Sequence, residues 1–561
     1  MFDTVEGFSG ERVIEEFEAL TKDATRVQRE TLQRILRDNG EAEYLQKLGL
    51  GGRTDPLSFK SCVPLVTHQD LEPYIQRIAD GDASQVLTGR PITSISLRRK
   101  PKFVPFNEEL VQCTMQTYRT SFAFRNRAFP IGNGKALQFI YSSKQFNTKG
   151  DLIATTATTN VYRSQQFKRT MEDIQSQCCS PDEVIFSPDY KQSLYCHLLC
   201  GLIYSEEVQF VFSTFANSIV HAFRTFELVW EELCNDIREG VLSSRITIPS
   251  IRAAVSRLLF PNPQLADTIY NKCVGLSSWI NGAYLSKLRH YAGNLPLISA
   301  DYGASENWIG VNVDPEEPPE SAIFTVLPNI GYFEFMPLNE DGYKIGVENS
   351  ASIMECTEPE TVGLTEVSLG KEYEIIITNF AGLYRYRLGD VVKIAGFYNL
   401  TPKLQFVRRR NLILTVNIDK NTEKDLQLAV VEATKLLAAQ KLEVVDYTSH
   451  VDMSIYPGHY VIFLELNGNA SDEILGNCCD SLDRSFVDAG YVGSRKIRAI
   501  GPLELRMVCR GAFNMILEHY LALGAAMSQF KTPRCVPLSN RSVLQILNSN
   551  VIKSYFSTAY D

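Results

Sequence analysis

The stretch Tyr373-Glu374-Ile375-Ile376-Ile377-Thr378 has the composition of a β-strand, because β-branched and aromatic residues fill most of it. A second stretch of this kind lies upstream, where residues 323–337 are largely β-branched and aromatic. We therefore expect strands in both places. The fold class then depends on what lies between and around them.

Helical periodicity marks other parts of the chain. Residues 11–37 carry apolar side chains at helical spacing with charges between them, and Gly40 is a suitable stop. Another helix is expected at residues 218–238, and a short strand at residues 183–186. Strands interleaved with helices indicate a layered fold of the α/β (α+β) class.

The last ~150 residues have the size of a separate compact domain. Thr422 is expected to cap a helix, with Asp425 at the capping-box position, and residues 459–464 are expected to form a strand. The hinge is placed in residues 402–417, whose basic run 408–410 is interpreted as a solvated surface. We predict a large N-terminal domain, residues 1–409, and a small C-terminal domain, residues 410–561.

Composition excludes several classes of protein. The chain has 561 residues, 44% of them hydrophobic and 22% charged, so disorder and coiled coil are excluded as the main architecture. The formal charge of −9 argues against a nucleic-acid scaffold but permits a local basic site for a polyanion. No apolar run approaches the roughly 20 residues of a membrane helix, and the N-terminus has no signal-peptide pattern.

The 13 cysteines have no zinc-ligand spacing and the seven histidines are scattered. Buried free thiols are the better interpretation, with metal ligands second. We therefore expect a cytoplasmic protein, and the cysteines and histidines suggest no metal site.

The first candidate site is Asp301-Tyr302-Gly303-Ala304-Ser305-Glu306-Asn307-Trp308. It follows a strand-like run, residues 295–298, and ligands of open α/β sheets collect where strands end. Gly303 and Ala304 would let a flat base or an acyl phosphate approach the backbone, and Glu306 offers an oxygen ligand for Mg²⁺. A surface turn capped by Ser305 explains the same residues equally well.

Two further stretches have unusual patterns. In residues 382–392, Asp390 offers acceptors for both hydroxyls of a ribose, and Arg387 could bind a phosphate bidentately. The alternative is a twisted hairpin whose Tyr and Arg side chains stack on each other. In residues 529–535, Lys531 could neutralise an acyl phosphate as it forms, although a lysine in a turn is usually only exposed.

These three stretches resemble the plant auxin-responsive acyl-acid-amido synthetases. The resemblance runs along nearly the whole chain and is closest to the jasmonate–isoleucine branch. The other segments that carry it are residues 66–82, 156–163, 193–199, 458–460 and 555–559.

The resemblance implies the adenylate-forming-enzyme architecture: a large N-terminal domain with β-sheets flanked by helices, and a small mobile C-terminal α/β domain. It implies that an acid attacks the α-phosphorus of ATP with Mg²⁺ present, giving an acyl-adenylate and pyrophosphate. An amino acid then attacks the activated carbonyl, giving an amide and AMP. The implied partners are small molecules (jasmonate or a related acid, an amino acid and ATP), with no nucleic acid and no membrane, for a monomeric protein.

Site residues carried over from the family fall into four groups. Catalytic roles are implied for Lys531, Arg387 and Glu306, with Glu306 also the Mg²⁺ ligand. The implied ATP site comprises Ser96, Val111, Thr114, Asn160, Ala300, Asp301, Tyr302, Gly303, Ala304, Ser305, Asp390 and Lys531. The implied acyl-acid site comprises Thr114, Phe212, Thr214, Gly303 and Trp308. The implied amino-acid site comprises Thr155, Asn160, Glu504, Leu505, Arg506, Met507 and Val508. Ordinary core packing is the alternative for each pocket residue.

The sequence departs from the family pattern twice. The family's Ser/Thr/Gly-rich phosphate loop is missing after Leu97, where Arg98-Arg99 stands instead, and two side chains do not replace a cradle of backbone N–H groups. After Trp279 a longer family segment is reduced to residues 280–283. The expected function is an ATP-dependent ligase joining jasmonate to isoleucine. The alternatives are an impaired member, a splice or gene-model variant lacking the loop, and an auxin–amino acid synthetase.

Overall fold

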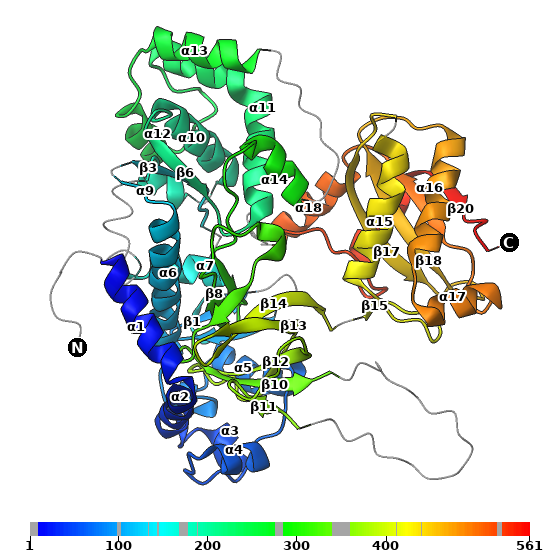
Figure 1. Ribbon diagram of the computed structural model, residues 1–561. Helices are drawn as coiled ribbons and strands as arrows, with labels where there is room; N and C mark the ends of the chain where they lie inside the picture. Colours follow the sequence, from blue (N-terminus) through cyan, green and yellow to red (C-terminus); the bar gives the residue numbers. More distant parts are fainter. Residues whose placement is uncertain are drawn as a thin grey trace. The chain divides into compact units, whose positions relative to one another are not determined.

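The computed structural model describes residues 9–97, 102–132, 134–142, 145–165, 167, 178–187, 189–274, 284–338, 360–410, 412–438, 440–523 and 530–560. Figure 1 labels its helices and strands. The contacts within the chain divide it into two compact units. Unit 1 comprises residues 1–132, 145–176 and 296–410, and unit 2 comprises the rest. Among the described residues, no helix is both long and apolar enough to cross a membrane.

An antiparallel sheet of eight strands organises unit 1, in the order β11-β10-β12-β13-β14-β9-β8-β7. The strands are β7 (Asp301–Gly303), β8 (Trp308–Val311), β9 (Phe324–Val326), β10 (Tyr332–Pro337), β11 (Val362–Gly363), β12 (Glu372–Thr378), β13 (Tyr386–Tyr398) and β14 (Thr401–Arg409). The strands expected at residues 323–337 and 373–378 are confirmed as β9, β10 and β12. Residues 373–378 of β12 are all buried, which explains why this strand alternates so little.

A second sheet of unit 1 has the order β2-β1-β5-β4. Its strands are β1 (Ser94–Leu97), β2 (Phe103–Phe106), β4 (Phe146–Asn147) and β5 (Ile153–Thr155). The helices of this unit are α1 (Gly10–Lys22), α2 (Ala24–Asn39), α3 (Glu43–Lys47), α4 (Pro56–Cys62), α5 (His68–Asp80), η1 (Ser84–Val86), α6 (Glu108–Ala128), α7 (Ala157–Arg163) and η2 (Pro319–Ser321). The expected helix at residues 11–37 is therefore two helices, which break at Asp23, where the backbone leaves the helical region.

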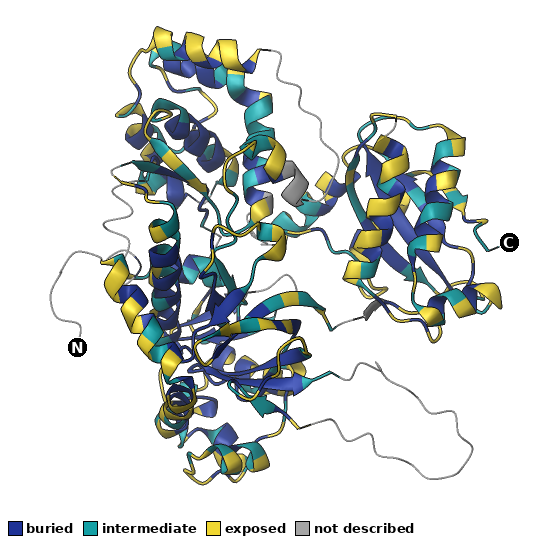
Figure 2. Cartoon of the chain, viewed as in Figure 1, coloured by how far each residue is buried: buried dark blue, intermediate teal, exposed yellow. Residues whose placement is uncertain are grey.

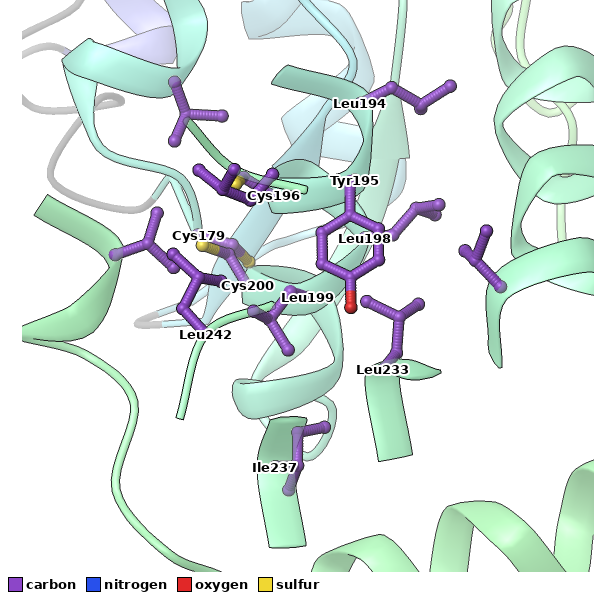
Figure 3. Close-up of a cluster of buried hydrophobic side chains, with 14 of the residues drawn as sticks. Cys179, Leu194, Tyr195, Cys196, Leu198, Leu199, Cys200, Leu233, Ile237 and Leu242 are labelled. Atoms are coloured by element: carbon purple, nitrogen blue, oxygen red, sulfur yellow. The ribbon is translucent and has the colours of Figure 1, made fainter. Parts of the chain in front are cut away.

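Unit 2 contains a parallel pair of strands and a helical cluster in residues 133–144 and 177–295. The elements are β3 (Lys135–Gln138), α9 (Asp182–Ile185), α10 (Tyr190–Ile203), β6 (Val208–Phe212), α11 (Ala216–Glu239), α12 (Pro249–Ser256), α13 (Pro263–Cys273) and α14 (Tyr284–Ala292). Figure 3 shows the core of this region, where Cys196 and Leu199 of α10 pack with Leu233 and Ile237 of α11. The helix expected at residues 218–238 is confirmed as α11.

The expectation of a strand at residues 183–186 is wrong, because the chain forms the helix α9 there. A short apolar run does not distinguish a strand from one buried helical turn. Here Asp182 and Glu183 occupy the first turn, where carboxylates are favourable, and Val184 and Ile185 are buried.

Residues 411–561 of unit 2 contain an α/β layer built on a four-stranded sheet of order β17-β18-β19-β20. The elements are β15 (Leu412–Leu414), β16 (Asn421–Thr422), α15 (Glu423–Ala438), β17 (Val444–Asp452), β18 (His459–Leu466), α16 (Asp472–Ser485), α17 (Ala489–Lys496), β19 (Glu504–Val508), α18 (Ala512–Ala522), α19 (Arg541–Ser549) and β20 (Val551–Phe556). Thr422 and Asp425 form the expected capping pair, and the strand expected at residues 459–464 is β18. Figure 2 shows buried strands behind helices whose outer faces are exposed.

Two local expectations need correction. Residues 295–298, expected to be strand-like, do not form a strand, and Asp301–Gly303 instead forms the edge strand β7. Residues 402–409 belong to β14 of the large sheet, so this part of the expected hinge is not a linker. The described cysteines are all free thiols, as expected.

Candidate functional site

The turn after β7 carries a buried carboxylate that faces an ammonium group. Glu306 is 1% exposed, and Lys102 Nζ lies 2.8 Å from its Oε1 and 2.6 Å from the hydroxyl of Tyr386. The amide of Ala304 donates to the carbonyl of Asn307, and Asn379 Nδ2 donates to the carbonyl of Glu306 at 2.7 Å. These bonds hold the turn, so the carboxylate is fixed in an environment where charge interactions are strong.

A second buried carboxylate lies on β13. Asp390 is 2% exposed; Tyr302 donates its hydroxyl to Oδ2 at 2.8 Å, and Arg409 Nε lies 3.2 Å from Oδ1. Oδ2 therefore accepts a hydrogen bond, and Oδ1 faces a guanidinium in an ion pair. Because an ionised carboxylate offers about four acceptor positions, further donors such as ribose hydroxyls can be accommodated.

The turn after β7 leads to Trp308 at the start of β8, whose indole ring forms an apolar surface that we call the indole wall. Trp308 donates its Nε1 proton to Thr114 Oγ1 at 3.1 Å, and the Tyr118 ring packs edge-on against it at 5.2 Å between centroids. A Cβ at Gly303 would come within 2.4 Å of the indole, so only glycine allows this approach. Thr114, Gly303 and Trp308, expected from sequence to bind the acid together, are therefore brought together in unit 1.

Three other expected residues converge at the ends of two parallel strands. Ser96 on β1 is paired with Thr155 on β5, and Asn160 Nδ2 on α7 lies 3.4 Å from Ser96 Oγ. Ser96 and Thr155 are fully buried. Val111 is also buried, in the first turn of α6.

The carboxylate of Asp301 lies in a different environment from those of Glu306 and Asp390. Ser121 Oγ lies 3.5 Å from Asp301 Oδ2 and 3.2 Å from the carbonyl of Ala300, so its single proton can serve one of them. Burial raises the pKa of Asp301 to about 6 from 3.8, against the attraction of Arg125 and the Ser121 hydroxyl. Asp301 therefore titrates closer to neutral pH than an exposed aspartate does.

Asp301→Asn is expected to stabilise the folded protein at pH 7.5 by about 1–2 kcal/mol. With a folded pKa of about 6 against 3.8 unfolded, the folded state binds the extra proton between these values. Stability therefore falls as pH rises from about 4 to 6 and stays lower above it. Urea unfolding should show that Asp301→Asn raises the free energy of unfolding at pH 7.5 and raises it less at pH 4.5. Asp314→Asn, at a 54% exposed side chain, is the control, and an equal gain at both pH values would contradict the prediction.

Arg387, expected to bind phosphate, is held by a carboxylate. Its Nη2 and Nε lie 2.7 Å and 3.2 Å from the two oxygens of Glu374, and Arg410 Nη1 bonds the same carboxylate. Arg408 pairs with Glu372 at 2.6 Å. The basic run 408–410 is therefore only partly exposed, and each of its arginines faces a carboxylate on β12 or β13.

The remaining expected residues belong to unit 2. Phe212 ends β6, and Thr214 follows it at a half-buried position. β19 is a central strand whose Leu505, Met507 and Val508 pack in two apolar cores. Glu504 accepts from Arg506 at 2.7 Å, and Lys531 is exposed.

Sequence reasoning missed three residues that touch the expected site: Lys102, Tyr118 and Arg409. Lys102 stands beside the missing loop in Lys-Pro-Lys-Phe, and Tyr118 follows Thr114 by one helical turn, so position gave a signal for both. For Arg409 the sequence contained no signal apart from its charge. Arg98, Arg99, the segment after Trp279 and Gln529 lie outside the described residues.

Comparison with family models gives three matches in chain order. Residues 13–284 match the GH3 family N-terminal domain, residues 324–409 the GH3 family central domain, and residues 424–540 the GH3 family C-terminal domain. The chain belongs to the GH3 family. The family expected from the sequence is thereby confirmed.

Relatives of this GH3 chain match it over its full length. A jasmonoyl-L-amino acid synthetase of Nicotiana attenuata is 65% identical over 583 residues, covering 100% of this chain and 99% of the relative. A jasmonoyl-L-amino acid synthetase of Oryza sativa subsp. japonica is 64% identical over 579 residues, covering 98% and 99%. The first alignment is longer than the 561 residues of this chain, so that relative has residues that this chain lacks.

A solved GH3 structure has the same fold. The acyl acid amido synthetase named GH3.15 superposes with a TM-score of 0.87 at 33% identity and covers 99% of both chains. The expected mixed α/β architecture is therefore confirmed, and the chain is a member of a family of acid–amino-acid ligases.

Proposed function

We propose that this chain is an ATP-dependent ligase that adenylates jasmonate and joins it to an amino acid, isoleucine foremost, through an amide bond. The observation that carries this proposal is the 65% identity to a jasmonoyl-L-amino acid synthetase along the whole chain. The geometry of unit 1 supports it, because the turn between β7 and β8 holds the buried Glu306, while Tyr302 on β7 binds Asp390 and Trp308 on β8 supplies the indole wall.

In this proposal the jasmonate carboxylate attacks the α-phosphorus of ATP, forming the acyl-adenylate and releasing pyrophosphate. The amine of the amino acid then attacks the acyl carbonyl, losing a proton as AMP leaves. Asp390 accepts the ribose hydroxyls while Tyr302 and Arg409 hold its carboxylate. Trp308 and Thr114 offer an apolar wall for the ring of the acid.

Glu306 suits a Mg²⁺ ion that is shared with phosphates. Carboxylate oxygen is a preferred donor, and such ions are commonly held by one or two carboxylates plus substrate phosphates. Its Oε1 is paired with Lys102 at 2.8 Å, so binding would require Lys102 to share or give up this contact. Among the described residues no three His, Cys, Asp or Glu side chains converge on a metal position, which leaves most ligands to the nucleotide. Bound there, the ion would neutralise charge on the phosphates.

The proposal includes two domains, residues 1–409 and a mobile domain of residues 410–561, in a cytoplasmic monomer. Unit 1 ends at Arg410, next to this boundary, whereas residues 133–144 and 177–295 of the proposed N-terminal domain belong to unit 2. The C-terminal domain supplies Lys531 to the phosphates, and residues 504–508 lie near the amino acid.

The test is acid-dependent exchange of labelled pyrophosphate into ATP, with jasmonate and indole-3-acetate in separate reactions. Exchange with jasmonate, followed by conjugate formation with isoleucine, is the expected result. The same assay is run on a variant with Ser-Ser-Gly-Thr inserted between Leu97 and Lys100. We expect this variant to be at least as active as the wild type. Folded protein that supports exchange with neither acid, in both forms, would overturn the proposal in favour of an impaired member.

A further inference from the structure

The segment that follows Lys531 lies along the outer edge of β17. The amide of Ser449 donates to the carbonyl of Arg534 at 2.9 Å, and the amide of Val536 donates to the carbonyl of Ser449 at 2.8 Å. Ser449 and Cys535 form a parallel bridge. Because β17 is the edge of its sheet, residues 532–536 cover backbone groups that would otherwise be open to pairing.

Side chains of β17 reinforce this attachment. Thr448 Oγ1 donates to the carbonyl of Pro533, and Ser449 Oγ donates to the carbonyl of Arg534 at 2.6 Å. His450 Nδ1 bonds the carbonyl of Val536 at 2.8 Å. Three consecutive side chains of one strand therefore bind three carbonyls of the segment.

Asp446 binds the segment at Thr532 and Arg534, directly after Lys531. Its Oδ2 accepts the hydroxyl proton of Thr532, and its Oδ1 lies 2.6 Å from Arg534 Nη1. The guanidinium of Arg534 also stacks over the ring of Tyr447, 4.1 Å from its centroid. The Asp446 and Arg534 side chains are 19% and 15% exposed, so solvent screens this ion pair only weakly.

Burial changes abruptly at this point. Thr532 is 6% exposed, whereas Lys531 is exposed. The side chain of Lys531 thus projects from a backbone that is anchored from the next residue onward. An anchored backbone loses less conformational freedom when its side chain is brought to a ligand.

We propose that Asp446 is a positioning residue for Lys531. By holding Thr532 and Arg534 together, it fixes the backbone from which the ammonium group reaches the phosphates. This inference rests on the proposed function, in which Lys531 stabilises the charge that develops during adenylation. Asp446 itself touches no substrate.

The test compares Asp446→Ala with the full-length wild-type protein. Pyrophosphate exchange should have a kcat about tenfold lower, with the KM for ATP within twofold. The amides of Ser449 and Val536 should exchange with deuterium at least tenfold faster. Asp472→Ala is the matched control, because Asp472 also binds one cation and one hydroxyl, Lys553 and Tyr555, and should change neither readout.

The variant Lys531→Ala,Asp446→Ala shows whether Asp446 acts through Lys531. If it does, the double variant is no slower than Lys531→Ala alone. A further loss in the double variant, a normal kcat in Asp446→Ala, or unchanged amide exchange would each overturn the inference. Thr532→Val removes one donor only and should show a smaller effect in the same direction, which covers the case in which Asp446→Ala does not fold.

Failure of the proposed function gives a different result. If neither the wild-type protein nor the loop-inserted variant supports pyrophosphate exchange, the proposed function is refuted and, with it, the role of Asp446 in adenylation. Deuterium exchange at Ser449 and Val536 would still report whether Asp446 anchors the segment.

Discussion

Asp390→Ala is expected to weaken ATP binding by at least about 100-fold. The buried carboxylate accepts charge-assisted hydrogen bonds, each worth about 1.5–3 kcal/mol, and two ribose hydroxyls depend on it in the proposed complex. The fold should survive, because Arg409, which loses its partner, has a side chain 51% exposed and remains hydrated.

Calorimetric titration with ATP and with 2′-deoxy-ATP checks this expectation. The wild type should prefer ATP, and Asp390→Ala should lose most of that preference because the group that reads the hydroxyl is gone. Tyr302→Phe keeps the carboxylate and removes one donor to it, so it should lie between the two. ATP affinity equal to that of the wild type, or an equal loss for both nucleotides, would contradict the ribose role of Asp390.

Much of the fold could be predicted because the deciding signals are local. The buried strand at residues 373–378 and the capped helix that begins at Glu423 depend on residues close in sequence. Expectations failed where one residue or a tertiary contact determined the secondary structure. Asp23 divides the first helix, and residues 183–186 pack as a helical turn although their composition suits a strand equally well.

The candidate site shows the same limit at longer range. Sequence patterns marked Asp390 and Glu306, but the groups that hold them, Arg409 and Lys102, come from other strands or distant segments. The charge of Arg409 was visible, whereas its pairing depends on the register of β13 against β14. No pattern within one stretch specifies that register.

Two arginines of residues 382–392, Arg385 and Arg387, differ in burial and in how many of their N–H donors the protein itself binds. Arg385 is buried and directs its guanidinium to Glu334, Thr361 and two backbone carbonyls, so its donors are taken by the protein itself. Arg387 binds one carboxylate, Glu374, which it shares with Arg410. A phosphate role is therefore more compatible with Arg387, since Arg410 can keep Glu374 paired if Arg387 turns away.

Lys531→Ala is expected to slow adenylation about 100- to 1000-fold, the range typical of removing one group that stabilises developing charge. Because Lys531 is exposed and its contact with the ring of Phe215, 5.4 Å from the centroid, is weak at an exposed site, the unfolding temperature should change little. Pyrophosphate exchange measures the first half-reaction, and supplying synthetic jasmonoyl-adenylate with isoleucine measures the second, which should proceed nearly normally. Lys496→Ala removes another exposed lysine of the same C-terminal region and should leave both half-reactions intact. Equal losses in the two half-reactions would mean that Lys531 serves substrate binding in general, and a first half-reaction within threefold of the wild type would remove it from the mechanism.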